Sequence, residues 1–203
     1  MGNLARIYHH QGKLNKAEQL EVQVLEMSKK LLGEEHQDTI MRMVNLSKTY
    51  YCQRKLHEAE NLGVQVLYMS KKLLGAEHPR TIISMGNLAR TYYHQAKLNK
   101  AEQLELQVLD MRKVLLGADH PVTILSMENL ARTYHQQGKR DEAEQLEVQV
   151  LDKRKKLLGV EHPDTISSMK KLARTYRHQG KLNEVSDMRK NKDTITSIGN
   201  LAR

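Results

Sequence analysis

Residues 79–120 read PRTIISMGNLARTYYHQAKLNKAEQLELQVLDMRKVLLGADH, and nearly all of the remaining chain repeats this text. A shift of 42 residues brings the stretch onto residues 121–162 with identity at about two thirds of the positions, and residues 37–78 match it less closely. Partial copies occupy both ends of the chain. An internal repeat of this length predicts a stacked array of similar structural units.

Each copy contains two apolar series with helical spacing, which we call helix A and helix B. Helix A carries apolar residues at i, i+3, i+6, i+7 and i+10, which lie on one face of an α-helix; they are Ile82, Met85, Leu88, Ala89 and Tyr92. Helix B carries a second series: Ala101, Leu104, Val108, Leu109, Met111, Leu115 and Leu116. Each copy is therefore expected to form a helical hairpin.

Turn and end signals separate the two helices. Asn99 or Asp141, each followed three residues later by a glutamate, is a variant of the capping box and is expected to open helix B. Gly117 lies just past helix B and is expected to end it. Pro121 suits the first position of the next helix A. Basic clusters close to the ends of the B helices are expected to complement the helix dipole: Lys29-Lys30, Lys71-Lys72, Arg112-Lys113 and Arg154-Lys155-Lys156.

One hairpin cannot bury its apolar stripe alone, whereas stacking on its neighbours gives a continuous core. Met85, Leu88, Ala89, Tyr92 and Ala101 lie at spacings 0, 3, 4, 7 and 16, which resembles the signature of the tetratricopeptide repeat (TPR). The period of 42 residues, with the NLA, QGK, AEQL and LLGxEHPxT motifs, resembles the TPRs of kinesin light chains and the arrays that follow the NB-ARC domain of signalling proteins. The resemblance implies an all-α fold, an α-solenoid of TPR helix-turn-helix repeats forming a right-handed superhelix.

The repeats depart from the TPR signature at two positions. Helix A has Met where Trp is common, and the bulky residue four positions after the helix B alanine is replaced by Glu21, Gly63, Glu105 or Glu147. We expect the preceding leucines to do that packing instead: Leu20, Leu62, Leu104 and Leu146.

The repeat boundaries predict a single array over residues 1–203. Residues 1–36 form a partial first repeat, residues 37–78, 79–120 and 121–162 form three full repeats, residues 163–192 form a shortened fifth, and residues 193–203 start a sixth helix A. Met1 falls on a repeat position, so the sequence is interpreted as a fragment of a larger protein or a truncated gene product. Ends without a polar capping face are expected to favour self-association.

Composition limits the classes of partner and location. The formal net charge is +9 and the isoelectric point is near 9.5, which favour an acidic partner. The single cysteine, Cys52, excludes an internal disulfide, and without a secretory signal a cytoplasmic location is expected. No apolar run reaches the length of a membrane span, so no membrane partner is expected.

The residues indicate no metal site, phosphate-binding loop or catalytic site. One histidine per repeat, in separate loops, predicts a capping and turn-packing role in place of a metal site; these are His36, His78, His120 and His162. No glycine-rich loop that could cradle phosphate and no nucleophile with a base in reach is present. The sequence therefore predicts no enzyme, no cofactor and no metal.

The side of helix A opposite the core stripe carries the candidate binding residues. In a TPR stack this side lines the concave groove, and at 100° per residue it holds three series that recur through the repeats. The apolar series is Met41, Ile83 and Leu125, the amide series is Asn3, Asn45, Asn87 and Asn129, and the cationic series is Arg6, Lys48, Arg90, Arg132 and Arg174. Lys171 breaks the amide series in the fifth repeat.

These series predict a scaffold that binds an extended acidic peptide. The amides would pair with its backbone, and the cations would select acidic side chains. The resemblance to kinesin light chains implies that these asparagines contact a peptide. Each series also has an alternative interpretation. The apolar residues would fill the contacts between adjacent A helices, the amides would bond to the neighbouring helix, and the cations would be solvated charges without a ligand. Two other functions remain open: a self-assembling structural array, and a nucleic-acid surface. The second is motivated by charge alone and opposed by the scarcity of groove aromatics beyond Tyr51 and Tyr93.

Overall fold

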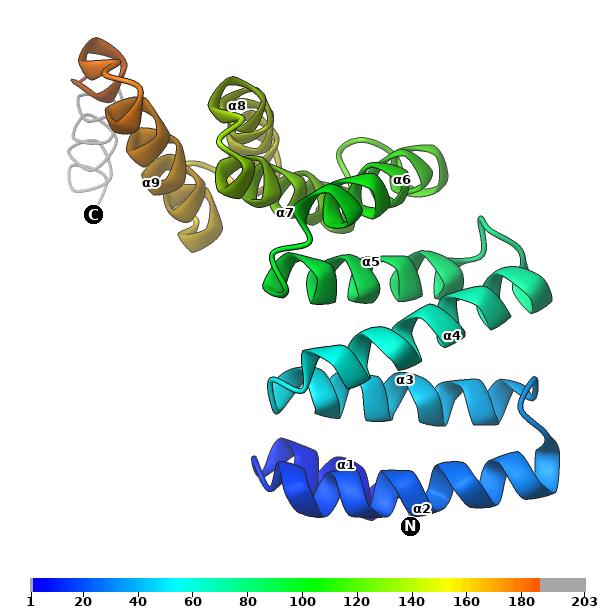
Figure 1. The fold of residues 1–203 in the computed structure, drawn as a ribbon. Coiled ribbons are helices and arrows are strands. Elements are labelled where there is room, and N and C mark those ends of the chain that lie inside the picture. Colours follow the sequence, from blue (N-terminus) through cyan, green and yellow to red (C-terminus); the bar gives the residue numbers. More distant parts are fainter. Residues whose placement is uncertain (1, 187–203) are drawn as a thin grey trace, which may run out of the picture. The chain divides into compact units, whose positions relative to one another are not determined.

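The structure is a computed structural model that describes the backbone of residues 2–186 and the side chains of residues 4–186, and the described part is built from helices joined by short turns (Figure 1). The helices are α1 (Gly2–His10), α2 (Leu14–Leu32), α3 (Gln37–Cys52), α4 (Leu56–Leu74), α5 (Pro79–His94), α6 (Leu98–Leu116), α7 (Pro121–Gln137), α8 (Arg140–Leu158) and α9 (Pro163–His178). Odd-numbered helices are the A helices and even-numbered ones are the B helices. The predicted all-α array of helical hairpins is confirmed. The end of the fifth repeat and the sixth helix A, from residue 187 on, lie outside the described residues.

The chain divides into two compact units, Met1–Met111 and Arg112–Arg203, with the division inside α6. In the first unit, each helix from α1 to α4 packs on the next one along the chain. In the second unit, α8 packs on both α7 and α9. Both units therefore use the same nearest-neighbour stacking of A and B helices, as a repeat array requires.

The core of the three full repeats is centred on the helix A methionine and the helix B alanine. Met43, Met85 and Met127 are at most 1% exposed, and Met85 packs with Ile82 and Val108. The alanines of the B helices are equally buried, which lets the helices approach closely: Ala17, Ala59, Ala101 and Ala143. The leucines expected to replace the missing bulky residue do pack against the core where clusters are resolved, at Leu62 and Leu104.

The predicted end signals of both helices are present. The glycines that follow the B helices have φ of 88°, 88° and 82° with ψ near 165°, a backbone region open almost only to glycine; they are Gly33, Gly75 and Gly159. Prolines occupy the first turn of α5, α7 and α9. The repeated histidine is the N-cap of the A helix, because its Nδ1 accepts the N–H two residues later at 3.1–3.2 Å. The capping role expected of His36, His78, His120 and His162 is confirmed.

Replacing His78 with alanine is expected to lower the free energy of unfolding by about 1 kcal/mol, because the Arg80 N–H loses its acceptor at the start of α5. His78→Asn, which keeps a side-chain acceptor at the N-cap, should recover most of that loss. Urea denaturation followed by circular dichroism measures both variants. Equal stability of His78→Ala and the unaltered protein would show that the cap contributes nothing.

The predicted capping box at the start of helix B is wrong. The N-cap residues are Lys13, Lys55 and Lys139, none of which makes a side-chain cap hydrogen bond, and Asp141 already lies in the first turn of α8. Asn99 is likewise the second residue of α6. The helix begins early because a residue of positive φ closes the turn before it: Gly12, Arg54, Ala96 or Gly138. The lysine N–H then bonds back to the preceding A helix, as from Lys55 to the Tyr50 carbonyl at 2.9 Å.

The glutamate of the supposed box links neighbouring repeats instead. Glu18 forms an ion pair with Lys55 of the next repeat, with 2.7 Å between Oε2 and Nζ. Glu60 and Lys97 form the equivalent pair, at 2.5 Å. In the second unit Glu144 and Lys181 repeat it at 2.5 Å. The hydrogen bond from Lys55 holds the pKa of Glu18 below its usual value. These pairs fix successive B helices to one another.

Candidate functional site on the helix A face

Two hollows open on the helix A side of the first unit. The α3–α5 hollow is a shallow depression lined from three helices: Val44, Ser47, Lys48 and Tyr51 of α3, Gly63 and Val66 of α4, and Ser84, Asn87, Leu88, Arg90 and Thr91 of α5. The α1–α3 hollow is deeper, with a volume of about 280 Å³, and is lined by Ala5, Arg6, His9, His10, Glu21, Val24, Arg42, Asn45 and Lys48. Lys48 borders both hollows, so the two form adjoining parts of one surface.

The structure brings five residues of the predicted series to these hollows. Lys48, Asn87 and Arg90 line the α3–α5 hollow, and Arg6 and Asn45 line the α1–α3 hollow with Lys48. Met41 and Ile83 line neither, although both lie on the same helices. The predicted amide and cationic series thus border concave surface in the first unit, whereas the apolar series does not.

The apolar residues of the face remain open to solvent. Met41 is 39% exposed, Ile83 is 50% exposed and Leu125 is 49% exposed. If these side chains served only to fill contacts between adjacent A helices, they would be buried more completely. A large part of each one is therefore available to a partner.

The amides of the first unit have no hydrogen-bonding partner among residues 4–186. Both Asn45 and Asn87 are half-buried, and neither side chain makes a hydrogen bond to another described residue. Asn129 differs, because its Oδ1 accepts a bond of 3.3 Å from Arg132 Nη2 on the same helix. The side chain of Asn3 lies outside the described residues. The alternative of an amide bonded to the neighbouring helix is not seen for Asn45 or Asn87.

The cations of the face are exposed and differ in their surroundings. The Arg90 guanidinium lies 4.5 Å from the centre of the Tyr51 ring, a cation–π contact that orients it over the α3–α5 hollow. Lys48 and Arg174 form no ion pair within the described part of the chain. Arg132 contacts Asn129, as described above. At Lys48 and Arg174, the face therefore presents positive charge that no carboxylate of the described residues neutralises.

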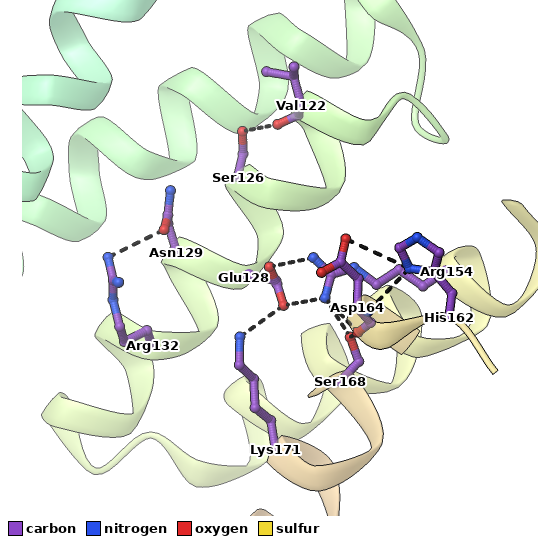
Figure 2. A network of polar contacts seen from close by, with 10 residues as sticks. All are labelled: Val122, Ser126, Glu128, Asn129, Arg132, Arg154, His162, Asp164, Ser168 and Lys171. Carbon is purple, nitrogen blue, oxygen red and sulfur yellow. Dashed lines mark hydrogen bonds and ion pairs between the residues drawn. The ribbon is translucent and has the colours of Figure 1, made fainter. Parts of the chain in front are cut away.

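In the second unit a carboxylate from α7 is held between cations from α8 and α9 (Figure 2). Glu128 forms a two-pronged ion pair with Arg154, at 2.9 Å and 3.0 Å, and its Oε1 also accepts from Lys171 Nζ at 3.0 Å. Arg154 Nη1 donates further to Ser168 Oγ at 2.8 Å and to the Asp164 carbonyl at 3.0 Å. Lys171, which breaks the amide series, is therefore engaged inside the protein.

Lysines of the basic clusters lie in the last turn of the B helices, as expected, but two arginines of these clusters also bind neighbouring helices. Arg154 joins α8 to both neighbouring A helices, and Arg112, one repeat earlier, donates to Ser126 Oγ at 2.7 Å. Burial lowers the pKa of the Arg112 guanidinium. These two arginines bind neighbouring A helices because they sit a turn or more before the helix end, where the side chain is covered by the next repeat.

A second buried polar group was missed by sequence reasoning. Glu147 is 9% exposed; its Oε1 lies 2.9 Å from His135 Nε2, and its Oε2 accepts from Thr175 Oγ1 at 2.6 Å. Glu21 occupies the same repeat position in the first unit. Burial raises its pKa, and nearby Thr49 and His9 partly offset that effect. The recurrence of glutamate where a TPR carries a bulky residue was the signal that could have found this group.

The described residues contain neither a candidate metal site nor a candidate membrane span. Within residues 4–186, no three side chains of His, Cys, Asp or Glu are grouped so as to hold a metal ion. None of the described helices combines the length and the apolar character needed to cross a membrane.

The chain matches a known protein family and resembles several solved structures. The tetratricopeptide repeat family matches residues 81–122 and 123–164 with one repeat type and residues 1–67 with another. A crystal structure of a putative kinesin light chain from Podosopora anserina, with nearly identical TPR-like repeats, is 31% identical, covers 98% of this chain and 94% of that chain, and has a TM-score of 0.86. No curated protein matches the chain.

Two more distant structures share the fold. BtubC (BKLC) from P. vanneervenii is 21% identical, with 97% and 78% of the two chains covered and a TM-score of 0.81. A Rap protein complexed with competence and sporulation factor is 14% identical, with 92% and 50% covered and a TM-score of 0.67. Stacked helical hairpins of this kind form a scaffold for protein–protein interaction. The chain belongs to the tetratricopeptide repeat family and is similar to its kinesin light chain-like arrays.

Proposed function

We propose that the protein binds an extended, acidic segment of another protein along the helix A face. The observation that carries this proposal is the pair of amides, Asn45 and Asn87, that have no partner within the described residues and border the two hollows beside Lys48 and Arg90. Open donors and acceptors next to cations are suited to a peptide backbone with acidic side chains. Leu125, Asn129, Arg132 and Arg174 would make contacts of the same kind in the second unit.

Each series has a separate part in the proposed complex. The amides pair with backbone N–H and C=O groups, so they hold an extended segment whatever its side chains. The cations select carboxylates, and the exposed Met41 and Ile83 cover apolar side chains of the segment. The net charge of +9 favours the encounter with an acidic partner and should make it faster at low salt.

The proposal places the array in a larger cytoplasmic protein of NB-ARC/TPR or kinesin light chain-like type. The Rap structure named above was solved with competence and sporulation factor, which is a precedent for a partner bound to this fold in that protein. The interaction role requires no catalytic residue.

Binding to a library of extended peptides, acidic and neutral, at low and physiological salt tests the proposal. We expect a preference for acidic peptides that weakens as salt rises. Asn45→Ala/Asn87→Ala should weaken binding of all peptides in the library. Lys48→Glu/Arg90→Glu should weaken acidic ones by about tenfold or more, because each substitution places like charges together.

Matched controls separate the face from the overall charge. Lys30→Glu/Lys71→Glu makes the same change of charge on exposed positions of helices α2 and α4, and Asn61→Ala removes an exposed amide from α4. These variants should bind like the unaltered protein. Equal losses in face and control variants would reject the helix A face as the site. Mass that rises with concentration, or salt-dependent oligonucleotide binding without peptide binding, would favour the self-assembly or nucleic-acid alternative.

A further inference from the structure

The α1–α3 hollow is the larger of the two hollows on the helix A side of the first unit, and charged side chains from three helices line it. Its volume of about 280 Å³ suits one side chain with its backbone, since pockets for small-molecule ligands run from about 300 to 1,000 Å³. Arg6, Arg42 and Lys48 contribute positive charge, with His9 and His10 beside them, and Glu21 is the one acidic residue in its lining. The lining is therefore suited to an anion.

The guanidinium of Arg42 lacks a partner among the described residues. Its Nε is buried and unpaired, and its terminal nitrogens also make no hydrogen bond to a described residue. Glu21 in the same lining already has Thr49 and His9 beside it. Buried polar groups are nearly always paired, so the unpaired guanidinium points to an acceptor that a ligand would supply.

Arg42 has no equivalent in the other repeats. The positions 42, 84 and 126 residues further along hold Ser84, Ser126 and Ser168. Each of these serines donates to the carbonyl four residues earlier on its own helix, at 2.9–3.1 Å. The stacked fold is thus satisfied by serine at this position, and the arginine serves some other purpose in the first unit.

The second unit shows how the repeat holds a carboxylate at the corresponding place. There Glu128 of one A helix lies against Arg154, while Ser168 and Lys171 come from the next A helix (Figure 2). The positions equivalent to Glu128 and Ser168 hold Gly2 and Arg42. Of these two residues, Arg42 lines the α1–α3 hollow, and the sequence has no carboxylate at the position of Glu128.

We propose that the α1–α3 hollow binds an aspartate or glutamate residue of a partner segment, with Arg42 and Lys48 receiving its carboxylate. This subsite rests on the function proposed above and adds a residue, Arg42, to the set that reads the segment. The carboxylate supplies the acceptor that the Arg42 guanidinium lacks among the described residues.

The test uses a small probe, N-acetyl-glutamate N-methylamide, and its neutral counterpart, N-acetyl-glutamine N-methylamide. Nuclear magnetic resonance of ¹⁵N-labelled protein reports the Nε–H of Arg42 directly. We expect a saturable shift of that resonance with the glutamate probe and affinity at least about tenfold lower for the glutamine probe. Arg42→Ser should abolish the preference and still fold, because serine occupies the position in three other repeats. Arg80→Ser, at an exposed position outside the hollow, should leave the titration unchanged.

Two results would overturn the subsite: no saturable shift with the glutamate probe, or equal affinity for both probes. Failure here can be told from failure of the broader proposal. Acidic peptides that bind Arg42→Ser as they bind the unaltered protein, yet lose affinity in Asn45→Ala/Asn87→Ala, would reject the subsite and retain the peptide face. Saturable binding of the glutamate probe by a protein that binds no extended peptide would retain the subsite and reject the extended face.

Discussion

Replacing Met85 with alanine is expected to lower the free energy of unfolding by about 2–5 kcal/mol. Met85 is fully buried at the centre of the third repeat, where it packs with Ile82, Val108 and the partly buried Leu104. The substitution removes those contacts and leaves a cavity that the surrounding helices can fill only in part. Urea denaturation followed by circular dichroism at 222 nm is the measurement.

Ile83 provides the matched control for this prediction. It is two positions earlier on the same helix, and it is 50% exposed on the face proposed to bind the partner. Ile83→Ala should change stability by no more than about 0.5 kcal/mol. Equal losses for Met85→Ala and Ile83→Ala would mean that both faces of α5 are core, and the assignment of the binding face would be wrong.

Replacing Glu128 with glutamine is expected to lower stability by about 2–3 kcal/mol, the second largest effect. The side chains of Glu128 and Arg154 are only 12% and 15% exposed, so the guanidinium would be left largely buried without its carboxylate. Breaking a buried ion pair from one side costs about 3–5 kcal/mol, and the remaining solvent access of this pair reduces the figure. Thermal and urea unfolding both report the loss. Glu161→Gln, an exposed glutamate in the turn before α9, is the control and should be near neutral.

A double-mutant cycle with Arg154→Gln distinguishes the ion pair from other effects of the substitution. The double variant should lose clearly less than the sum of the two single variants, because each single change already breaks the same pair. Additive losses would show that Glu128 and Arg154 stabilise the protein independently, and the picture of a carboxylate held by the array would fail.

The helices could be placed from the sequence because their signals are local. Spacing within one repeat located the core stripe of helix A, and Gly and Pro marked the helix ends. Gly33 follows α2, and Pro163 is the first residue of α9. The capping box failed because the same Asn and Glu pattern also fits a helix that has already begun. In this structure the glutamate forms an ion pair with a lysine of the next repeat, as Glu18 does with Lys55.

The polar groups between repeats could not be read from spacing within one helix. Glu147 meets His135 and Thr175 across three helices, and Arg154 meets Glu128 and Ser168 in the same way. These contacts depend on how neighbouring helices pack, which periodicity alone does not specify. The series on the helix A face were found because the helical projection needs only one helix at a time. Whether they bind a partner stays a prediction.

Mapping a bound peptide tests the central claim most directly. An acidic extended peptide selected from the library is titrated into ¹⁵N-labelled protein, and the side-chain amide resonances of Asn45 and Asn87 are followed with the backbone resonances of all helices. The account predicts saturable shifts of both amides and of neighbouring α3 and α5 residues, while exposed helix B residues such as Leu31 and Tyr68 stay unchanged. Shifts confined to the B helices, with both amides unmoved by a peptide that binds, would contradict it.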